Sequence, residues 1–233
     1  MGADLSTGRH SMRHPLDWYV EEQWCTEQLF HAAGLEFELE CGTAIWDPCC
    51  GYGNIGVALE AWAPDLRIIC SDVVDNLRRA DFLREPEFFS ADFLELEVAP
   101  APCTIVMNPP YSYQKGILEA FVRHALKLAS GRVFALVPNK WLASQRRYQL
   151  FAADHPPELV LHLTQRPSMP PGDMIEAMGD RAFRNGKIDY CWICWDATLR
   201  TAPGETRTAW LPPLGLAPMA TIPAFTNKTG EIG

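Results

Sequence analysis

Seven apolar runs of strand length recur along this chain, and stretches of helical length separate most of them. This alternation is typical of a largely parallel sheet with helices on both faces. The predicted strands cover residues 43–47, 67–72, 86–92, 103–108, 131–139, 158–164 and 189–196. The predicted helices cover residues 56–63, 75–84, 115–129 and 142–153. The fold class expected from this pattern is α/β.

The 233 residues, 48% of them apolar, predict one large domain. We expect it to span residues 16–197, after a flexible tail at 1–15 and before an irregular, proline-rich segment at 198–233. Residues 165–188 are rich in Pro, Gly, Met and charged residues and are too long for an ordinary connection, which predicts a binding loop or a mobile loop. No separate target-recognition domain is expected.

The cysteines and the lack of a long apolar run indicate a soluble, cytoplasmic protein without a membrane partner. No apolar run approaches the roughly 20 residues that a membrane helix needs, and most of the eight cysteines lie in apolar segments, as reduced core cysteines do. Cys191 and Cys194 form one CxxC without a second pair at zinc-ligand spacing, so no metal is expected.

The net charge of −9 argues against a nucleic-acid partner, but the charge is unevenly distributed. Residues 112–150 carry seven basic residues against Glu119 alone. Such a cluster can steer an anionic substrate, although Arg123 and Lys127, four residues apart, are better explained by a solvated helix face.

A glycine-rich stretch, DPCCGYGNIG, follows the first predicted strand, and Gly51, Gly53 and Gly56 have the spacing GxGxxG. Glycines allow a ligand to approach the backbone, and the next helix begins with free N–H groups. Asp72, about twenty residues later at the end of the next strand, can accept both hydroxyls of a ribose. Asp47, just before the glycines, would repel a pyrophosphate and suits a cationic ligand such as a sulfonium.

Asp92 and Phe93 end the third predicted strand, where they can contact an adenine amino group and ring. Each aspartate alone is equally well explained as a helix N-cap. Three of them at successive strand ends favour a nucleoside-containing cofactor.

The fourth predicted strand, CTIVM, is stopped by Asn108, Pro109, Pro110 and Tyr111. Two prolines cannot continue a central strand, because they lack the N–H group that the sheet needs. This stop predicts a stiff loop at a strand end, where functional groups are common.

Four motifs in this order resemble class I S-adenosylmethionine-dependent methyltransferases, and among them the DNA adenine-N6 methyltransferases. They are DPCCGYGNIG (47–56), SDVVD (71–75), ADFLE (91–95) and MNPPYS (107–112). Their order is similar to the gamma-type arrangement of that family. The resemblance implies a Rossmann-like class I methyltransferase fold, with a seven-stranded, mostly parallel sheet, helices on both faces and an antiparallel last strand.

The resemblance also implies a cofactor, S-adenosylmethionine, with S-adenosylhomocysteine as its product and no metal. The stretch DWYVEEQW is similar to the family's N-terminal motif, but Tyr-Val-Glu replaces Tyr-Thr-Pro, so only Trp18 and Tyr19 are carried over. The implied cofactor-binding residues are Trp18, Tyr19, Asp47, Pro48, Gly51, Gly53, Asp72, Val73, Asp92, Phe93 and Asn108. The implied catalytic residues are Asn108, Pro109, Pro110 and Tyr111.

The NPPY loop suits methylation of an exocyclic amine, whose lone pair is delocalised into the ring. Asn108 Oδ1 and the Pro109 carbonyl can accept both N–H groups and so localise that lone pair, while Tyr111 stacks on the base. No Cys lies in a loop after the fourth strand, which argues against methylation of a cytosine ring carbon.

The expected function is therefore methylation of adenine N6 in DNA, either at a base flipped out of a duplex or in a single strand. Candidate contacts to DNA are Lys140, Trp141, Arg146, Arg147 and Arg166. The alternatives are methylation of a glutamine side-chain amide in a protein, or of adenine in RNA. A cofactor-binding protein without turnover ranks last. Without a target-recognition domain, either the loop at residues 165–188 reads a short site by itself, or a second copy of the chain contributes to recognition in a homodimer.

Overall fold

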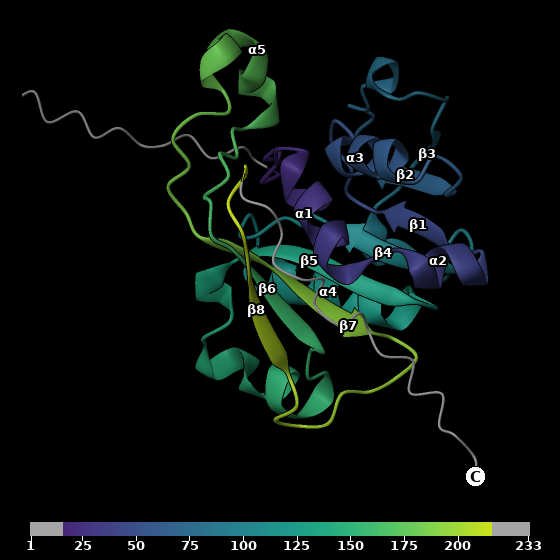
Figure 1. Cartoon of the computed structure of the whole chain (residues 1–233), viewed down its shortest axis with the longest axis vertical. Coiled ribbons are helices and arrows are strands. Elements are labelled where there is room, and N and C mark those ends of the chain that lie inside the picture. Colours follow the sequence, from purple (N-terminus) through teal and green to yellow (C-terminus); the bar gives the residue numbers. More distant parts are fainter. Residues whose placement is uncertain (1–15, 216–233) are drawn as a thin grey trace, which may run out of the picture.

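Eight strands form one sheet, in the order β3-β2-β1-β4-β5-β7-β6-β8 (Figure 1). The computed structural model describes residues 16–215, so the tail predicted at 1–15 and the residues after 215 lie outside the described part. The strands are β1 Ala44–Asp47, β2 Ile68–Asp72, β3 Glu87–Ser90, β4 Cys103–Met107, β5 Arg132–Pro138, β6 Leu159–Leu163, β7 Tyr190–Asp196 and β8 Arg207–Leu211.

The strand directions confirm the predicted fold class. Strands β1 to β5 are parallel to one another, and β7 lies antiparallel between β5 and β6. This is the strand order of the Rossmann-like class I methyltransferase fold, with all seven predicted strands present. The prediction of an irregular segment at 198–233 was wrong for residues 207–211, because these residues form β8, an eighth strand parallel to β6. Burial of Leu211 among the core residues explains why this edge strand forms.

The helices differ more from the predictions. They are α1 Trp24–Ala33, α2 Glu36–Cys41, α3 Asn54–Trp62, α4 Ile117–Leu128 and α5 Ile175–Met178. The helices predicted at 56–63 and 115–129 are confirmed as α3 and α4. The helix predicted at 75–84 was wrong, since that segment contains only one 3-10 turn, Arg79–Asp81. Leu77 and Phe82 of this segment pack against the glycine loop, in space where side chains on Gly53 and Gly56 would lie.

The segment predicted as a helix at 142–153 consists of a 3-10 turn, Gln145–Arg147, and a π-helical turn, Leu150–Asp154. Ser144 interrupts it, because its side chain accepts a hydrogen bond from the Arg146 N–H, as in an N-cap. The predicted loop at 165–188 contains only short helical turns, including α5, which lies apart from the sheet in Figure 1.

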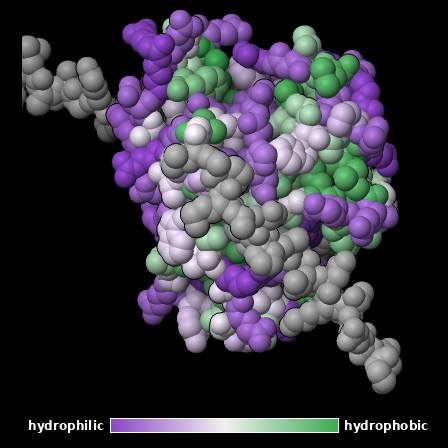
Figure 2. All heavy atoms as spheres, viewed as in Figure 1, coloured by the Kyte–Doolittle hydropathy of each residue, from purple (hydrophilic) through white to green (hydrophobic). Residues whose placement is uncertain are grey.

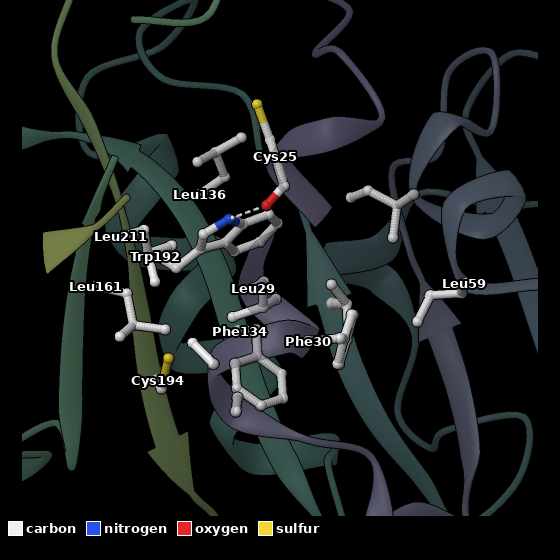
Figure 3. Packing of buried hydrophobic residues seen from close by; sticks show 14 of the residues in the cluster. Cys25, Leu29, Phe30, Leu59, Phe134, Leu136, Leu161, Trp192, Cys194 and Leu211 are labelled. Atoms are coloured by element: carbon white, nitrogen blue, oxygen red, sulfur yellow. Dashed lines mark hydrogen bonds between the residues drawn. The ribbon is translucent and has the colours of Figure 1, made fainter. Parts of the chain in front are cut away.

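One face of the sheet packs against α1 and α3. Figure 3 shows Leu29 and Phe30 of α1 near Phe134 of β5, and the indole N–H of Trp192 donates to the Cys25 carbonyl over 2.9 Å. This bond satisfies the polar atom of a fully buried tryptophan and ties α1 to β7. The face is therefore held by both apolar packing and one buried hydrogen bond.

The opposite face packs against α4. Side chains alternate between the faces along each strand, so Ile45 joins the α1 face while Trp46 joins the α4 face. Trp46 contacts Phe93 edge-on, with ring centroids 5.4 Å apart. Both faces of the central strands are consequently buried, which explains their continuous apolar runs.

A buried ion pair joins α2 to the amino-terminal end of β5. Arg132 is 3% exposed and Glu38 is not exposed at all, and Arg132 Nε donates to Glu38 Oε1 over 2.8 Å. Arg132 also donates to the carbonyls of Ala33 and Gly34. One of the basic residues in the cluster at 112–150 is therefore part of the core.

Figure 2 shows that hydrophilic side chains cover most of one face of the molecule, with hydrophobic ones in smaller areas between them. Scattered exposed apolar residues of this kind are usual on protein surfaces. Among the helices described for residues 16–215, none is both long and apolar enough to cross a membrane.

Candidate functional site

A cavity of about 570 Å³ lies beyond the carboxyl ends of β1, β2 and β4. In open α/β sheets ligands bind at this edge, where neighbouring strands connect in opposite directions. Here that position is between β1 and β4, which are adjacent in the sheet. The lining comes from the loops after β1 to β4 and from residues 16–21. The fold therefore gathers the four motifs of the sequence around one cavity.

Asp72 ends β2 and holds the glycine loop in place. Its Oδ2 accepts from the Gly51 N–H over 2.8 Å, and its Oδ1 accepts from the Val74 N–H over 3.4 Å. Each carboxylate oxygen keeps further lone pairs for a ligand. Burial raises the pKa of Asp72 above its ordinary value.

Gly51 is needed for its backbone shape and for its lack of a side chain. Its φ is +50°, and a Cβ atom there would lie 2.6 Å from Nε1 of Trp18. Trp18 itself packs edge-on against Tyr52, at 5.1 Å between ring centroids. Both Trp18 and Gly51 line the cavity, as predicted for cofactor-binding residues.

Asp47 lies beneath the cavity wall and does not line it. It is 2% exposed, and its Oδ1 accepts from the Cys49 N–H over 3.2 Å. Burial raises the pKa of Asp47 well above its ordinary value. Gly53, also predicted in the site, instead provides space for Leu77 and Phe82. Asp47 and Gly53 therefore shape the glycine loop without facing the cavity.

The remaining predicted cofactor residues reach the cavity. Asp92 caps the 3-10 turn Phe93–Glu95 by accepting from the Leu94 N–H, so it serves as an N-cap and lines the cavity as well. Phe93 is buried against Trp46 and still contributes to the wall. The other predicted residues on the wall are Tyr19, Pro48 and Val73.

Asn108 follows β4 and is bound to residues 17–21, which we call the N-terminal strap. Its Nδ2 donates to Glu21 Oε2 over 2.7 Å and to the Tyr19 carbonyl over 3.0 Å. Four residues after Asn108, the Ser112 N–H donates to the Asp17 carboxylate at the start of the strap. The strap thus holds both ends of the NPPY loop against the cavity.

Tyr111 lies differently from the prediction that it stacks on a bound base. It does not line the cavity, and its ring packs near Tyr190, with centroids 6.0 Å apart. Its hydroxyl donates to Asn108 Oδ1 and also lies 3.2 Å from the Leu136 carbonyl oxygen. Tyr113 lines the cavity in its place, with 43% of its surface exposed. Of the two prolines, Pro110 reaches the cavity wall and Pro109 is buried behind it.

The cavity is acidic. Four carboxylate residues line it, and within the described residues no Lys, Arg or His does; the four are Asp17, Glu21, Asp72 and Asp92. Burial also raises the pKa of Glu21, although the hydrogen bond from Asn108 opposes the shift. These carboxylates do not group with other ligating side chains into a metal site anywhere in residues 16–215. A cation suits this cavity, and a pyrophosphate does not.

The residues predicted to contact DNA lie outside the cavity. Arg147 packs over the Trp141 ring at 5.0 Å and donates to the Trp141 carbonyl. Arg166 is paired with Asp189 over 2.6 Å. Lys140 and Arg146 are exposed and form no salt bridge with any described residue.

The basic cluster at 112–150 is also weaker than its sequence indicates. Arg132 is buried against Glu38, and Arg123 pairs with Glu119 and Asp154. Fewer free positive charges therefore remain to steer an anionic substrate than the sequence predicts.

The strap connects the cavity to the long loop at 165–188. Tyr19 and Pro171 form an antiparallel bridge, and the Val20 N–H donates to the Pro170 carbonyl over 3.0 Å. Gly172 packs on Trp18 so closely that a Cβ atom would lie 2.2 Å from its ring. The loop at 165–188 thus supports the strap from the side away from Asn108.

Sequence reasoning missed Asp17, Glu21, Tyr52 and Tyr113. Glu21 is followed by Glu22 and Gln23 in the sequence, so no local pattern distinguished it. The contacts of Asp17 and Tyr113 likewise depend on tertiary structure and have no local signal.

No protein-family model matches this chain, and no curated protein matches it. The similar solved structures include a proposed RNA methyltransferase of Pyrococcus horikoshii, with 18% identity, 73% of this chain and 81% of the other covered, and a TM-score of 0.49. A predicted O-methyltransferase of Agrobacterium tumefaciens gives 18% identity, coverages of 79% and 85%, and a TM-score of 0.46.

A third similar structure is geranyl diphosphate C-methyltransferase of Streptomyces coelicolor, crystallised with Mg²⁺, geranyl diphosphate and S-adenosylhomocysteine. It gives 17% identity, coverages of 70% and 77%, and a TM-score of 0.43. Because all three TM-scores lie below 0.5, these likenesses carry no argument about this chain.

Proposed function

We propose that this protein transfers a methyl group from S-adenosylmethionine to the exocyclic amino group of adenine in DNA. The observation that carries the proposal is the position of Asn108, whose carboxamide lies on the wall of an acidic cavity with its NH2 end bound to the protein. Its oxygen is therefore the end available to accept a hydrogen bond from an amine. A stiff acceptor beside a site for a cation is the arrangement that amine methylation requires.

The cavity residues fit the cofactor. S-adenosylmethionine supplies a methyl group on a positively charged sulfur, and the carboxylates of Glu21 and Asp72 suit that charge and the charge of its amino group. Asp72 has lone pairs left for ribose hydroxyls after binding the Gly51 N–H. Asp92 and Phe93 are placed on the wall where an adenine can contact both.

The NPPY loop would act on the target amine by accepting its hydrogens. Asn108 Oδ1 takes one N–H, which helps to localise the nitrogen lone pair. The Pro109 carbonyl, expected from the sequence to take the other N–H, belongs to a residue that lies behind the cavity wall. Pro109 and Pro110 stiffen the loop, since each proline fixes its own φ angle. As the methyl carbon bonds to this nitrogen and leaves the sulfur of the cofactor, S-adenosylhomocysteine is released and the methylated amine gives up one proton to water, so neither a nucleophilic cysteine nor a general base is needed for this step.

DNA is the proposed substrate because Lys140, Arg146 and Arg147 follow β5, at the same edge of the sheet as the cavity. A glutamine side-chain amide in a protein is the second candidate. The net charge of −9 and the ion pairs within the basic cluster favour it over DNA, whereas the exposed Lys140 and Arg146 favour DNA.

The test is incubation with radiolabelled S-adenosylmethionine and, in separate reactions, unmethylated duplex DNA, single-stranded DNA, RNA and a protein extract. Label in DNA alone supports the proposal. Label in protein or in RNA identifies one of the alternatives, and binding of the cofactor without transfer to any acceptor contradicts an enzymatic role.

A further inference from the structure

We propose that Glu21 is a positioning residue for Asn108, holding the NH2 end of its carboxamide so that Oδ1 faces the target amine. This inference rests on the proposed function for its consequence in the reaction. The contact itself does not depend on that function: Asn108 Nδ2 lies 2.7 Å from Glu21 Oε2 and 3.0 Å from the Tyr19 carbonyl oxygen.

The two ends of a carboxamide have nearly the same shape, so packing alone does not set its orientation. Hydrogen bonding does set it here. The NH2 group has two hydrogens, and the strap supplies one acceptor for each. In the flipped orientation Oδ1 would face a carboxylate and a carbonyl oxygen, which would lose both bonds and add repulsion between acceptors.

The other end of the carboxamide agrees with this orientation. The Tyr111 hydroxyl donates to Oδ1, which requires an oxygen there. Burial raises the pKa of Tyr111 well above its ordinary value, so the phenol remains a donor at neutral pH. A carbonyl oxygen has two lone pairs, and one is left for the amine.

Stability gives no reason for a carboxylate at position 21. Glu21 is 6% exposed and forms no ion pair within residues 16–215. A buried carboxylate without an ionic partner costs free energy that an apolar side chain of similar volume would not. Tyr19 contributes only its backbone carbonyl, which any residue would supply. Glu21 is therefore the residue whose side chain orients Asn108.

Two variants separate the hydrogen bond from the charge. Glu21→Gln keeps an oxygen acceptor for Asn108 and loses the charge, whereas Glu21→Leu loses both. The matched control is Glu22→Leu, which removes a carboxylate from the next position; Glu22 accepts from the Ser168 N–H and does not line the cavity.

The first measurement needs no activity. In protein labelled with ¹⁵N, the side-chain signal of Asn108 is assigned by its loss in Asn108→Ala, and its hydrogen exchange with solvent is measured. We expect Glu21→Leu to speed this exchange about tenfold, while Glu21→Gln and Glu22→Leu stay within about threefold of the unmodified protein. Equal exchange in all four proteins would overturn the contact.

The second measurement is a double-mutant cycle on the transfer rate. Glu21→Leu should lower kcat by about tenfold to a hundredfold, Glu21→Gln should restore most of it, and Glu21→Leu should cause no further loss in Asn108→Ala. An equal loss in both backgrounds would show that Glu21 acts elsewhere. If the unmodified protein methylates nothing, the proposed function fails, and the exchange rates alone decide the contact.

Discussion

Tyr111 donates its hydroxyl hydrogen to Oδ1 of Asn108, the oxygen that we propose accepts the target amine. The hydroxyl takes one lone pair of this oxygen and leaves the other for the amine, and the ring lies against Tyr190 instead of on the cavity wall. A tyrosine in an NPPY loop thus need not be a stacking platform in this protein.

Removing that hydroxyl should not slow methyl transfer. In Tyr111→Phe the ring stays packed, and Glu21 and the Tyr19 carbonyl still hold the NH2 end of Asn108, so we expect kcat close to that of the unmodified protein. Steady-state kinetics with the acceptor that the labelling experiment identifies checks this. A loss of more than about tenfold would show that the phenol takes part in the reaction.

Asp72→Ala should weaken binding of S-adenosylmethionine by about tenfold to a hundredfold, the range expected for loss of hydrogen bonds to a charged group. Titration calorimetry measures this directly. The control is Asp75→Ala, three residues further on, where an exposed carboxylate pairs with Arg79 over 2.9 Å and does not line the cavity. Unchanged affinity in Asp72→Ala would rule out the ribose contact.

Asp47→Asn should stabilise the ligand-free protein at alkaline pH. Burial raises the folded-state pKa of Asp47, so its neutral form contributes stability at low pH that is lost as the pH rises through the raised pKa. Asparagine stays neutral and can still accept from the Cys49 N–H. We expect an advantage at pH 8 of about 1.4 kcal/mol for each unit by which the pKa is raised.

That advantage should shrink toward zero as the pH falls to the ordinary pKa of an aspartate. Urea denaturation of both proteins at several pH values gives the difference in the free energy of unfolding. If the unmodified protein were more stable than Asp47→Asn at pH 8, the raised pKa of Asp47 would be contradicted.

Arg132→Met should destabilise the fold by about 3 to 5 kcal/mol, because it leaves the fully buried Glu38 carboxylate without its partner. The matched control is Arg67→Met, which breaks an exposed ion pair with Glu87 and should cost less than about 1 kcal/mol. Urea denaturation measures the loss in the free energy of unfolding. An equal loss in the two variants would show that the buried Glu38 carboxylate does not depend on Arg132.

The sheet and the loops at its edge could be predicted from the sequence because their signals are local. A strand buried on both faces is a continuous apolar run, as in RVFALVP of β5, and the stops after β1, β2 and β4 carry Asp, Gly and Pro. The strand β8 escaped prediction because it is an edge strand in which only Leu211 is buried. Its formation depends on pairing with β6, which no local pattern reveals.

The orientation of side chains was the part that sequence could not supply. The charges of residues 112–150 are adjacent in sequence, yet Arg132 is in the core and Arg123 is paired on α4. Tyr111 and Tyr113 are two residues apart, and only the structure decides which of them reaches the cavity. The contacts of Glu21 with Asn108 and of Asp17 with Ser112 join residues that are 87 and 95 positions apart in the sequence.

The most direct test of the central claim is the chemical identity of the methylated product. Unmethylated duplex and single-stranded DNA are incubated with S-adenosylmethionine carrying a deuterated methyl group, digested to nucleosides and examined by mass spectrometry, with Asn108→Ala as the matched variant. We predict deuterated N6-methyl-2′-deoxyadenosine with the unmodified protein, and on the order of a hundredfold less with Asn108→Ala at nearly unchanged cofactor affinity. No alkylated adenine, or an equal yield from both proteins, would contradict the account.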